Sequence, residues 1–245
     1  MTQATKYALI TGGNKGIGFE IAQKLGLQGI AVIIGARNKD RGEEAVKKLA
    51  AQGINAQFVQ LDLNNPATIT TSAAWVQDTL GHLDILVNNA GIMDTRDGAP
   101  GNTDLTVIRE VFETNFFGTL MVTQAMLPLL KKSPSARIVN VSSQLGSLAL
   151  NRDPEWEYAS AKLIGYNASK AAVNMLTIQL AWELQDSNIK VNSANPGYTA
   201  TDLVPGAAEH GQPVEDGART AIQLALLSED GPTGEFRDND GVVPW

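Results

Sequence analysis

The hydrophobic residues of this chain change their period again and again, and that alternation limits most strongly which folds are open to it. Short apolar runs rich in β-branched residues have the length and composition of buried strands. They cover residues 7–10, 30–34, 56–61, 83–87, 136–141 and 189–194. Longer stretches with helical spacing lie between them, at 16–28, 39–51, 67–80, 104–130 and 166–186.

A strand and a helix together take about 25–30 residues, which is typical of right-handed βαβ units on a parallel sheet. The sequence therefore predicts an α/β fold: one doubly wound, Rossmann-type parallel sheet of about seven strands, flanked by helices. No linker rich in Pro, Gly or Ser divides the chain, so we expect a single domain over residues 1–245. Three irregular zones, 94–103, 145–165 and 196–213, follow predicted strands, where the ligand site of such a sheet lies.

Composition narrows the class of function. Hydrophobic residues make up 43% and charged residues 18% of the 245, as in an ordinary folded protein. The net charge of −7 disfavours contact with a phosphate backbone, so we expect no nucleic-acid partner. The chain has no cysteine and only two histidines, His82 and His210, which argues against a metal site.

The sequence also lacks membrane and export patterns. No run of 18 apolar residues is present that could form a transmembrane helix. No apolar stretch of signal-peptide length follows Met1. We therefore expect a cytoplasmic protein with no membrane partner.

A glycine-rich loop follows the first predicted strand. Within Thr11–Gly18 (TGGNKGIG), the glycines Gly12, Gly16 and Gly18 are spaced G-x-x-x-G-x-G, and a helical pattern begins there. Such glycines let backbone N–H groups approach a pyrophosphate at a helix N-terminus, where the helix dipole favours negative charge. The loop predicts a dinucleotide site, although taken alone it also fits a glycine-rich turn with no ligand. No Gly-Lys-Ser/Thr follows in the P-loop register, which argues against a nucleoside triphosphate.

A second motif, Asn88–Gly91 (NNAG), follows the fourth predicted strand. Its small residues and two amides suit close packing against a flat ring and its ribose, although an ordinary strand-end turn has the same composition. With both motifs in this order, the sequence resembles the short-chain dehydrogenase/reductase family, and within it the carbonyl-reductase-like subgroup. The resemblance rests on Thr11–Gly18, Asp62, Asn88–Gly91, Asn115, Ile138–Ser143, Tyr166–Lys170 (YNASK) and Asn195–Gly197 (NPG). The subgroup is indicated by Gly35–Arg37, Asn115–Gly118 (NFFG) and the final Val242–Trp245 (VVPW).

The resemblance implies a nicotinamide cofactor and a set of residues that contact it. These are Gly12, Asn14, Lys15, Gly16, Ile17, Gly18, Arg37, Asn38, Asp62, Leu63, Asn89, Ala90, Gly91, Tyr166, Lys170, Pro196, Gly197 and Thr199. Enzymes that use NAD place a carboxylate at the end of the second strand to hold the ribose 2′-hydroxyl. Here Arg37 stands at that place, and the first carboxylate after the second predicted strand is Asp40. A guanidinium can bind a 2′-phosphate with two hydrogen bonds, and Lys15 adds a second positive charge, so we expect NADP(H) and no metal.

Tyr166 and Lys170 are expected to project from one face of a helix, because they are spaced i, i+4. A tyrosine hydroxyl has a pKa near 10 in water, and a neighbouring ammonium would lower it. The resemblance implies that Tyr166 protonates a carbonyl oxygen while a hydride is added to the carbon, and that Ser143 binds the same oxygen. It implies that Asn115 holds a water linking Lys170 to solvent. Alone, a Tyr/Lys pair at this spacing also fits a helix surface, and a lone serine at a strand end also fits a turn cap.

The motif Tyr-x-x-x-Lys occurs twice, at Tyr158–Lys162 and at Tyr166–Lys170. The distance from Ser143 favours the first copy. The second copy is followed by a long amphipathic stretch, whereas Gly165 weakens any continuous helix after the first copy. The family also places Pro-Gly about 30 residues after its tyrosine, which fits Tyr166. We therefore predict that Tyr166 is the reacting tyrosine.

The segment 149–165 is longer than the family usually has between serine and tyrosine. In relatives with an insertion here it covers a helix face used for tetramer assembly, so we expect a monomer or dimer. The expected reaction is NADPH-dependent reduction of an aldehyde or ketone, reversible as alcohol oxidation. The alternative is a catalytically silent NADP-binding sensor or scaffold. We expect the substrate site to be lined by 93–103, 145–165 and 198–213, which contain Leu, Trp and Tyr, and the substrate to be an uncharged, partly apolar small molecule.

Overall fold

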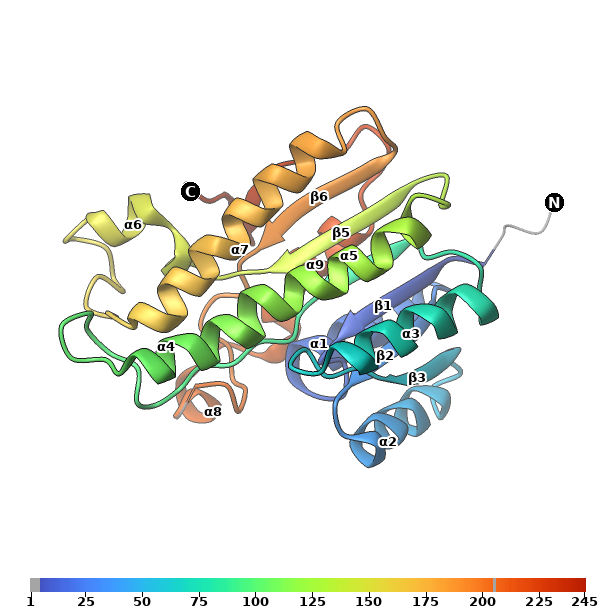
Figure 1. Cartoon of the computed structure of the whole chain (residues 1–245), viewed down its shortest axis with the longest axis horizontal. Coiled ribbons are helices and arrows are strands. Elements are labelled where there is room, and N and C mark those ends of the chain that lie inside the picture. Colours follow the sequence, from blue (N-terminus) through green and yellow to red (C-terminus); the bar gives the residue numbers. More distant parts are fainter. Residues whose placement is uncertain (1–4, 205) are drawn as a thin grey trace.

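A computed structural model describes residues 5–204 and 206–245 of the chain. Within these residues the strands form one eight-stranded sheet in the order β3-β2-β1-β4-β5-β6-β7-β8 (Figure 1). The strands are β1 (Tyr7–Thr11), β2 (Ala31–Ala36), β3 (Ala56–Gln60), β4 (Ile85–Asn88), β5 (Ala136–Val141), β6 (Ile189–Ala194), β7 (Phe236–Asp238) and β8 (Gly241–Val242). All neighbouring strands are parallel except the β7–β8 pair, which is antiparallel. The α/β class and the parallel sheet are confirmed; the short antiparallel β8 makes the strand number eight instead of about seven.

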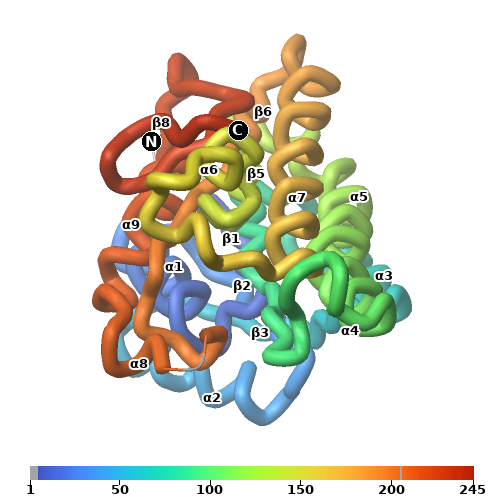
Figure 2. The backbone as a smooth tube through the Cα atoms, turned by 90° about the vertical axis from the view of Figure 1, so that its left-hand side faces the viewer, coloured from blue at the N-terminus to red at the C-terminus, as the bar shows by residue number. Residues whose placement is uncertain are grey.

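Helices cover both faces of the sheet. They are α1 (Gly16–Leu27), α2 (Lys39–Ala50), α3 (Pro66–Thr79), α4 (Leu105–Phe112), α5 (Thr119–Leu130), α6 (Leu148–Arg152), α7 (Ile164–Glu183), α8 (Ala207–His210) and α9 (Val214–Ala225). Figure 2 shows α3, α4, α5 and α7 on one side of the sheet and α1 and α9 on the other. The expected helix 104–130 is divided: α4 and α5 are joined by a π-helical turn, Glu113–Gly118.

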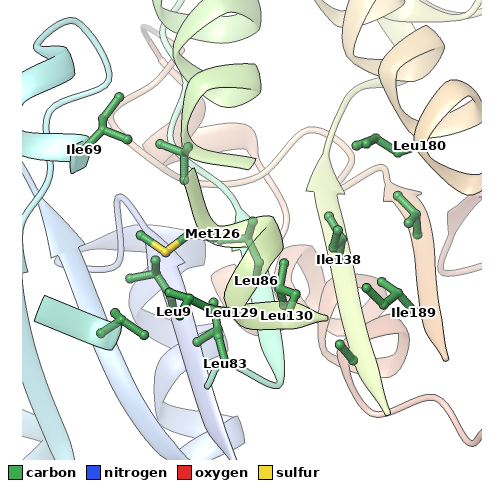
Figure 3. Close-up of a cluster of buried hydrophobic side chains, with 14 of the residues drawn as sticks. Leu9, Ile69, Leu83, Leu86, Met126, Leu129, Leu130, Ile138, Leu180 and Ile189 are labelled. Carbon is green, nitrogen blue, oxygen red and sulfur yellow. The ribbon is translucent and has the colours of Figure 1, made fainter. Parts of the chain in front are cut away.

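Alternation of side chains along each buried strand produces two separate cores. In β1, Leu9 points to the core under α3, α5 and α7, whereas Ala8 and Ile10 point to the core under α1, α2 and α9. Figure 3 shows the first core, where Met126 of α5 lies over the central strands. Every residue of β2, β4 and β5 is buried on one face or the other, which is why the central strands read in the sequence as nearly continuous apolar runs.

A row of buried polar side chains crosses the central strands. The Nδ2 of Asn88 in β4 donates to the Oδ1 of Asn140 in β5 at 2.8 Å, and the Nδ2 of Asn140 donates to the Oγ1 of Thr177 in α7 at 2.8 Å. The hydroxyls of Thr177 and Ser193 in β6 lie 2.8 Å apart. The four side chains, named here the polar row, are almost completely buried and hydrogen-bonded to one another.

The sheet turns its strand order around between β1 and β4, since β1 continues to β2 and β3 on one side and β4 continues to β5 and β6 on the other. The carboxyl ends of these strands meet at one edge, and the crevice at such a reversal point is where this architecture binds ligands. Among the residues described, none of the helices combines the length and apolarity required to traverse a bilayer.

Candidate active site

A cleft of about 670 Å³ lies at the carboxyl ends of β1, β2, β4 and β5. Its lining comes from Gly12, Asn14–Gly18, Ala36, Arg37, Leu61–Asn64, Asn89–Met93, Thr114, Val141, Ser142, Tyr166, Lys170, Pro196, Ala200–Leu203 and Val214. Segments from both ends of the chain thus meet around one space. The volume lies in the range of small-molecule and cofactor sites.

The glycine loop is shaped for close approach of a ligand to backbone. Gly12 and Gly16 have φ values of 65° and 54°, which favour glycine. A Cβ on Gly18 would lie 2.5 Å from the Nδ2 of Asn89, so no larger residue fits there. α1 begins at Gly16, and its N-cap residue Lys15 makes no side-chain capping hydrogen bond. The first amides of α1 are therefore available to an anion in the cleft, as the pyrophosphate of a dinucleotide requires.

Thr11 joins the glycine loop to the end of β4. Its Oγ1 accepts hydrogen bonds from the backbone amides of Asn89 at 2.9 Å and Ala90 at 3.0 Å. The Nδ2 of Asn89 donates to the carbonyl oxygen of Thr11 at 2.9 Å. The side chain of Asn89 thus braces the two motifs against each other, a role that its position in the sequence did not reveal.

Two cations border the outer end of the cleft. Arg37 is exposed where β2 ends, and the Nζ of Lys15 lies 2.8 Å from the Oδ2 of Asp202. The neighbour of Arg37, Asn38, does not line the cleft; its side chain accepts a hydrogen bond from the amide of Arg41 and caps α2. The cleft therefore carries two positive side chains at the place where a 2′-phosphate is expected, and one carboxylate that the sequence did not predict.

Tyr166 lies in the first turn of α7 and its side chain is buried at the inner end of the cleft. Burial raises the pKa of Tyr166 to about 12, although a side-chain hydrogen bond with Ser143 acts in the opposite direction. Lys170 lies one turn further on, with its Nζ 5.7 Å from the centroid of the Tyr166 ring and 2.8 Å from the carbonyl oxygen of Val141, to which it donates. Burial lowers the pKa of Lys170 to about 8.

The net pKa of Tyr166 in the protein alone is raised, whereas a neighbouring ammonium was expected to lower it, because desolvation is the larger effect. Desolvation of a fully buried phenol favours its neutral form, and the ammonium of Lys170 is itself desolvated and tied to a carbonyl. The phenol of Tyr166 is consequently protonated throughout the neutral pH range.

The two adjacent serines have different surroundings. Ser142 is completely buried and its Oγ donates to the carbonyl oxygen of Lys170 at 3.3 Å. Ser143 is half-buried, and its Oγ accepts from the amide of Leu145 at 3.1 Å in addition to its contact with Tyr166. Ser143 itself does not line the cleft, but its side chain is hydrogen-bonded to the phenol of Tyr166, which does.

Asn115 lies in the π-helical turn between α4 and α5, with 1% of its surface exposed. Its Oδ1 accepts from the amide of Ile92 at 2.8 Å, and its Nδ2 donates to the carbonyl oxygen of Ile92 at 2.9 Å and to the Oγ of Ser169 at 3.0 Å. A Cβ on Gly91 would lie 3.3 Å from the Oδ1 of Asn115 and 3.4 Å from the Nζ of Lys170. The small size of residue 91 thus leaves space between these two side chains.

The loop after β6 lines the cleft with residues that differ in part from the predicted Pro196, Gly197 and Thr199. Pro196 lines the cleft, but Gly197 and Thr199 do not. The Oγ1 of Thr199 donates to the carbonyl oxygen of Pro196 at 3.0 Å, which folds the loop on itself. Thr201 and Asp202 take the places at the cleft instead.

The insertion 149–165 contributes no residue to the cleft, contrary to its expected place in the lining. It packs instead against the end of the chain, where the amide of Ala149 donates to the carbonyl oxygen of Trp245 at 3.0 Å (Figure 2). Tyr158 lies within this insertion, in a turn rather than a helix, and its ring packs nearly perpendicular to that of Trp156. Of the two tyrosines, Tyr166 is the one at the cleft.

The family model for short chain dehydrogenases matches residues 6–211. The chain belongs to the short-chain dehydrogenase family. A short-chain dehydrogenase of Penicillium roqueforti is 38% identical over 92% of this chain and 90% of its own length. Mouse carbonyl reductase [NADPH] 1 is 34% identical over the whole of both chains. The crystal structure of NADPH-bound carbonyl reductase from chicken fatty liver has a TM-score of 0.83 at 30% identity, covering 99% of this chain and 100% of that one.

This short-chain dehydrogenase is thus an oxidoreductase that acts on carbonyl or alcohol groups, with a carbonyl-reductase-like sequence. The resemblance read from its motifs is confirmed. Among the residues described, no group of three or more His, Cys, Asp or Glu side chains could hold a metal ion.

Proposed function

We propose that residues 1–245 form one catalytic domain that reduces an aldehyde or ketone with NADPH, using Tyr166, Lys170, Ser143 and Asn115. The observation that carries the proposal is the burial of Tyr166 and Lys170 together at the inner end of a cleft whose other end is a glycine loop. The names of the mouse and chicken relatives, both carbonyl reductases with NADPH, support the same assignment.

The cofactor's site is built from the residues of the cleft. The amides at the start of α1 face a pyrophosphate, and Asp62 and Leu63 lie after β3, where the family contacts adenine. Asn14, Ile17, Ala90, Gly91 and Pro196 also line the cleft. Arg37 and Lys15 supply two positive charges for a 2′-phosphate, which a carboxylate at the end of β2 would repel. Gly197, Thr199 and Asn38 stay part of the proposed site as residues that shape its borders.

When bound, NADPH supplies a hydride to the carbonyl carbon. Tyr166 holds the proton that the carbonyl oxygen requires, since its raised pKa of about 12 keeps the phenol protonated at neutral pH. Ser143, hydrogen-bonded to the same phenol, is placed to donate to that oxygen. Once the proton has left, Lys170 stabilises the tyrosinate through its positive charge. Asn115 fixes the backbone at Ile92 and borders the space next to Lys170 in which a water can reconnect the lysine to solvent.

The substrate is an uncharged, partly apolar carbonyl compound. The cleft lining includes the apolar side chains of Ile92, Met93, Leu203 and Val214, which supports this choice. The reverse reaction, oxidation of the corresponding alcohol, uses the same groups with the proton moving back to Tyr166.

The deciding experiment measures NADPH consumption with a panel of apolar aldehydes and ketones, in parallel with NADPH binding followed by cofactor fluorescence. We expect binding together with steady turnover on part of the panel. Binding without turnover across the whole panel would favour the NADP-binding sensor. Absence of binding would refute both assignments.

Two further features are proposed here. A monomer or dimer follows from the insertion 149–165, and light scattering tests it: a mass of four times 26.1 kDa would refute it. A cytoplasmic location, without nucleic-acid or membrane partners, is also proposed; the net charge of −7 disfavours contact with a phosphate backbone. Imaging of a fluorescent fusion tests the location.

A further inference from the structure

Asp97 is a buried carboxylate outside the set of residues already described. It lies in the loop between β4 and α4 with 9% of its surface exposed, and it takes part in no ion pair among the residues described. Its Oδ2 accepts a hydrogen bond from the amide of Tyr166 at 2.8 Å, and its Oδ1 accepts from the amide of Gly165 at 3.0 Å. A buried carboxylate that is paired with backbone instead of a cation requires such donors to offset its lost hydration.

The amides that donate these bonds belong to α7, the helix that carries Tyr166 and Lys170. α7 begins at Ile164, and its own N-cap residue, Leu163, makes no side-chain capping hydrogen bond. The first amides of a helix have no partner within it, so they need acceptors from elsewhere. Asp97 supplies acceptors for two of them, and the carbonyl oxygen of Gly98 accepts from Ile164 at 2.9 Å. The loop after β4 therefore caps α7, although Asp97 is 68 residues from Gly165 and 69 from Tyr166 in the sequence.

The contact is tight enough to fix the helix start. A Cβ on Gly165 would lie 3.0 Å from the Oδ2 of Asp97 and 3.3 Å from the Cα of Ile108 in α4. Glycine at 165 thus lets α7 approach both groups. On the other side of the same residue, the carbonyl oxygen of Tyr166 accepts from the Oγ of Ser169 at 2.8 Å. The backbone of Tyr166 is held at its amide by Asp97 and at its carbonyl by Ser169.

We propose that Asp97 is a positioning residue for catalysis, which acts through Tyr166 by fixing the first turn of α7 so that the phenol stays next to Ser143. The inference rests on the proposed reductase function, because it assigns a kinetic consequence to the placement of Tyr166. Small displacements of a reacting group reduce the rate strongly while leaving remote binding contacts intact. A loss of Asp97 should therefore appear in kcat and much less in the binding of NADPH.

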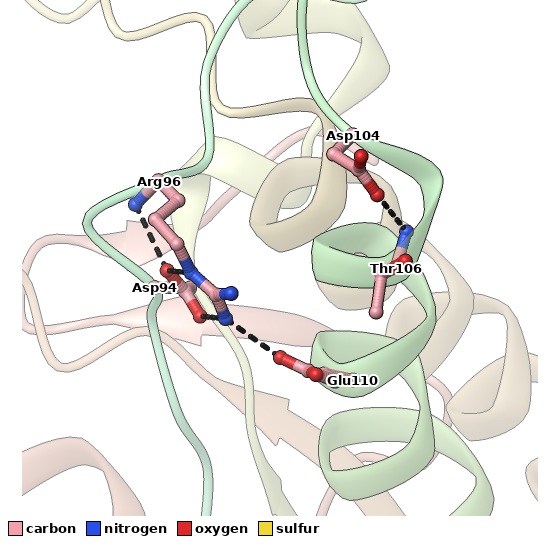
Figure 4. Close-up of polar contacts among 5 residues, drawn as sticks. All are labelled: Asp94, Arg96, Asp104, Thr106 and Glu110. Atoms are coloured by element: carbon pink, nitrogen blue, oxygen red, sulfur yellow. Dashed lines mark hydrogen bonds and ion pairs between the residues drawn. The ribbon is translucent and has the colours of Figure 1, made fainter.

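The first test compares Asp97→Ala and Asp97→Asn with a matched control, Asp104→Ala. Asp104 also caps a helix: its Oδ1 accepts from the amide of Thr106 at 2.7 Å at the start of α4 (Figure 4), but it is exposed and outside the cleft. All variants are measured well below their melting temperatures. We expect Asp97→Ala to lower kcat about 10- to 100-fold, with the Kd for NADPH changed less than about threefold. Asp97→Asn, which keeps one acceptor oxygen, should lie between Asp97→Ala and the starting protein, and Asp104→Ala should keep its kcat.

A second measurement does not depend on turnover. With 3-fluorotyrosine incorporated at the four tyrosines, the ¹⁹F signal of Tyr166 is assigned by its loss in Tyr166→Phe. We expect this signal to shift or broaden in Asp97→Asn, while it stays in place in Asp104→Ala. If Asp97→Ala does not fold, Asp97→Asn decides both measurements.

The outcomes separate the two proposals. A silent starting protein refutes the reductase function and leaves the ¹⁹F comparison to judge the placement of Tyr166. An active starting protein in which Asp97→Ala and Asp97→Asn keep kcat within threefold of the control overturns the role of Asp97 alone. A fall in kcat matched by an equal loss of NADPH affinity also overturns it, because that pattern indicates general loosening of the site.

Discussion

The Nζ of Lys15 and the Oδ2 of Asp202 form an ion pair at 2.8 Å, although 187 residues separate them in the chain. The pair joins the glycine loop to the loop after β6, and both side chains line the cleft. Lys15 lowers the pKa of Asp202 through this hydrogen bond, and Arg41 adds a weaker attraction. In the protein alone, Asp202 is thus paired with Lys15, one of the two cations that we propose bind the 2′-phosphate of NADPH.

Asp202→Asn should therefore strengthen NADPH binding. An exposed ion pair contributes only about 0–1 kcal/mol, so the expected gain from releasing Lys15 and removing a repelling charge is at most about fivefold in Kd. NADH, which has no 2′-phosphate, should bind unchanged. Asp78→Asn, an exposed carboxylate on α3 away from the cleft, controls for net charge. Weaker NADPH binding in Asp202→Asn would show instead that the ion pair between Lys15 and Asp202 helps to hold the cofactor.

Arg37→Asp should abolish or reverse the preference for NADPH over NADH. The substitution removes a charge-assisted contact worth about 1.5–3 kcal/mol and places a carboxylate where the ribose 2′-hydroxyl of NADH can donate to it. We expect the Kd for NADPH to rise at least about tenfold, measured by fluorescence titration. Lys47→Asp, at an exposed position in the last turn of α2, makes the same charge change as a control. Equal affinity for the two cofactors before any substitution would contradict the assignment of Arg37.

Tyr166→Phe should remove nearly all turnover and keep NADPH binding, because only the proton donor is lost. Tyr158→Phe should keep kcat within about tenfold, since Tyr158 is partly exposed and outside the cleft. Rapid mixing with saturating NADPH and one good carbonyl substrate gives both values. An inactive Tyr158→Phe beside an active Tyr166→Phe would transfer the catalytic role to the insertion.

The stability of the cofactor-free protein should rise between pH 8 and pH 10 because of Lys170. Burial lowers the pKa of Lys170 from 10.5 to about 8, so in this interval the unfolded chain binds more protons than the folded one. The free energy of unfolding therefore increases with pH, by roughly 2 kcal/mol from this group. The raised pKa of Tyr166 acts in the opposite direction, but only above pH 10. Urea titrations at several pH values should show the rise in the starting protein and its loss in Lys170→Met; an equal rise in both would assign it to other groups.

Those parts of the site that obey local rules could be predicted from the sequence. The i, i+4 spacing of Tyr166 and Lys170 placed them on one helix face, and the glycine spacing placed a loop at the start of α1. The period of the apolar residues gave the alternation of strands and helices, with errors of one or two residues at most ends. Local periodicity did not predict the π-helical turn that carries Asn115, because residues 104–130 were expected to form one helix and such turns are rare within helices.

The remaining parts depend on contacts between distant segments. Nothing near Asp97 or Asp202 in the sequence marks them, since each acts on a partner at least 68 residues away. The brace from Thr11 to Asn89 is equally long-range. The pKa of Tyr166 also followed from the fold: the sequence shows a lysine nearby, but only the packing shows that both groups lose their water.

The polar row has a consequence for how the chain finds its sheet. Two parallel strands of plain apolar residues can slide past each other by one position at little loss of hydrophobic contact, yet such a slip turns every side chain to the opposite face. In this protein a slipped β5 would leave the amide of Asn140 buried without Asn88 and Thr177, which penalises the wrong alignment. The same slip would exchange the faces of Ser142 and Ser143, which follow β5 directly. The three buried contacts of the polar row therefore favour one alignment of β5 over its neighbours. It is the alignment in which Ser143 contacts Tyr166.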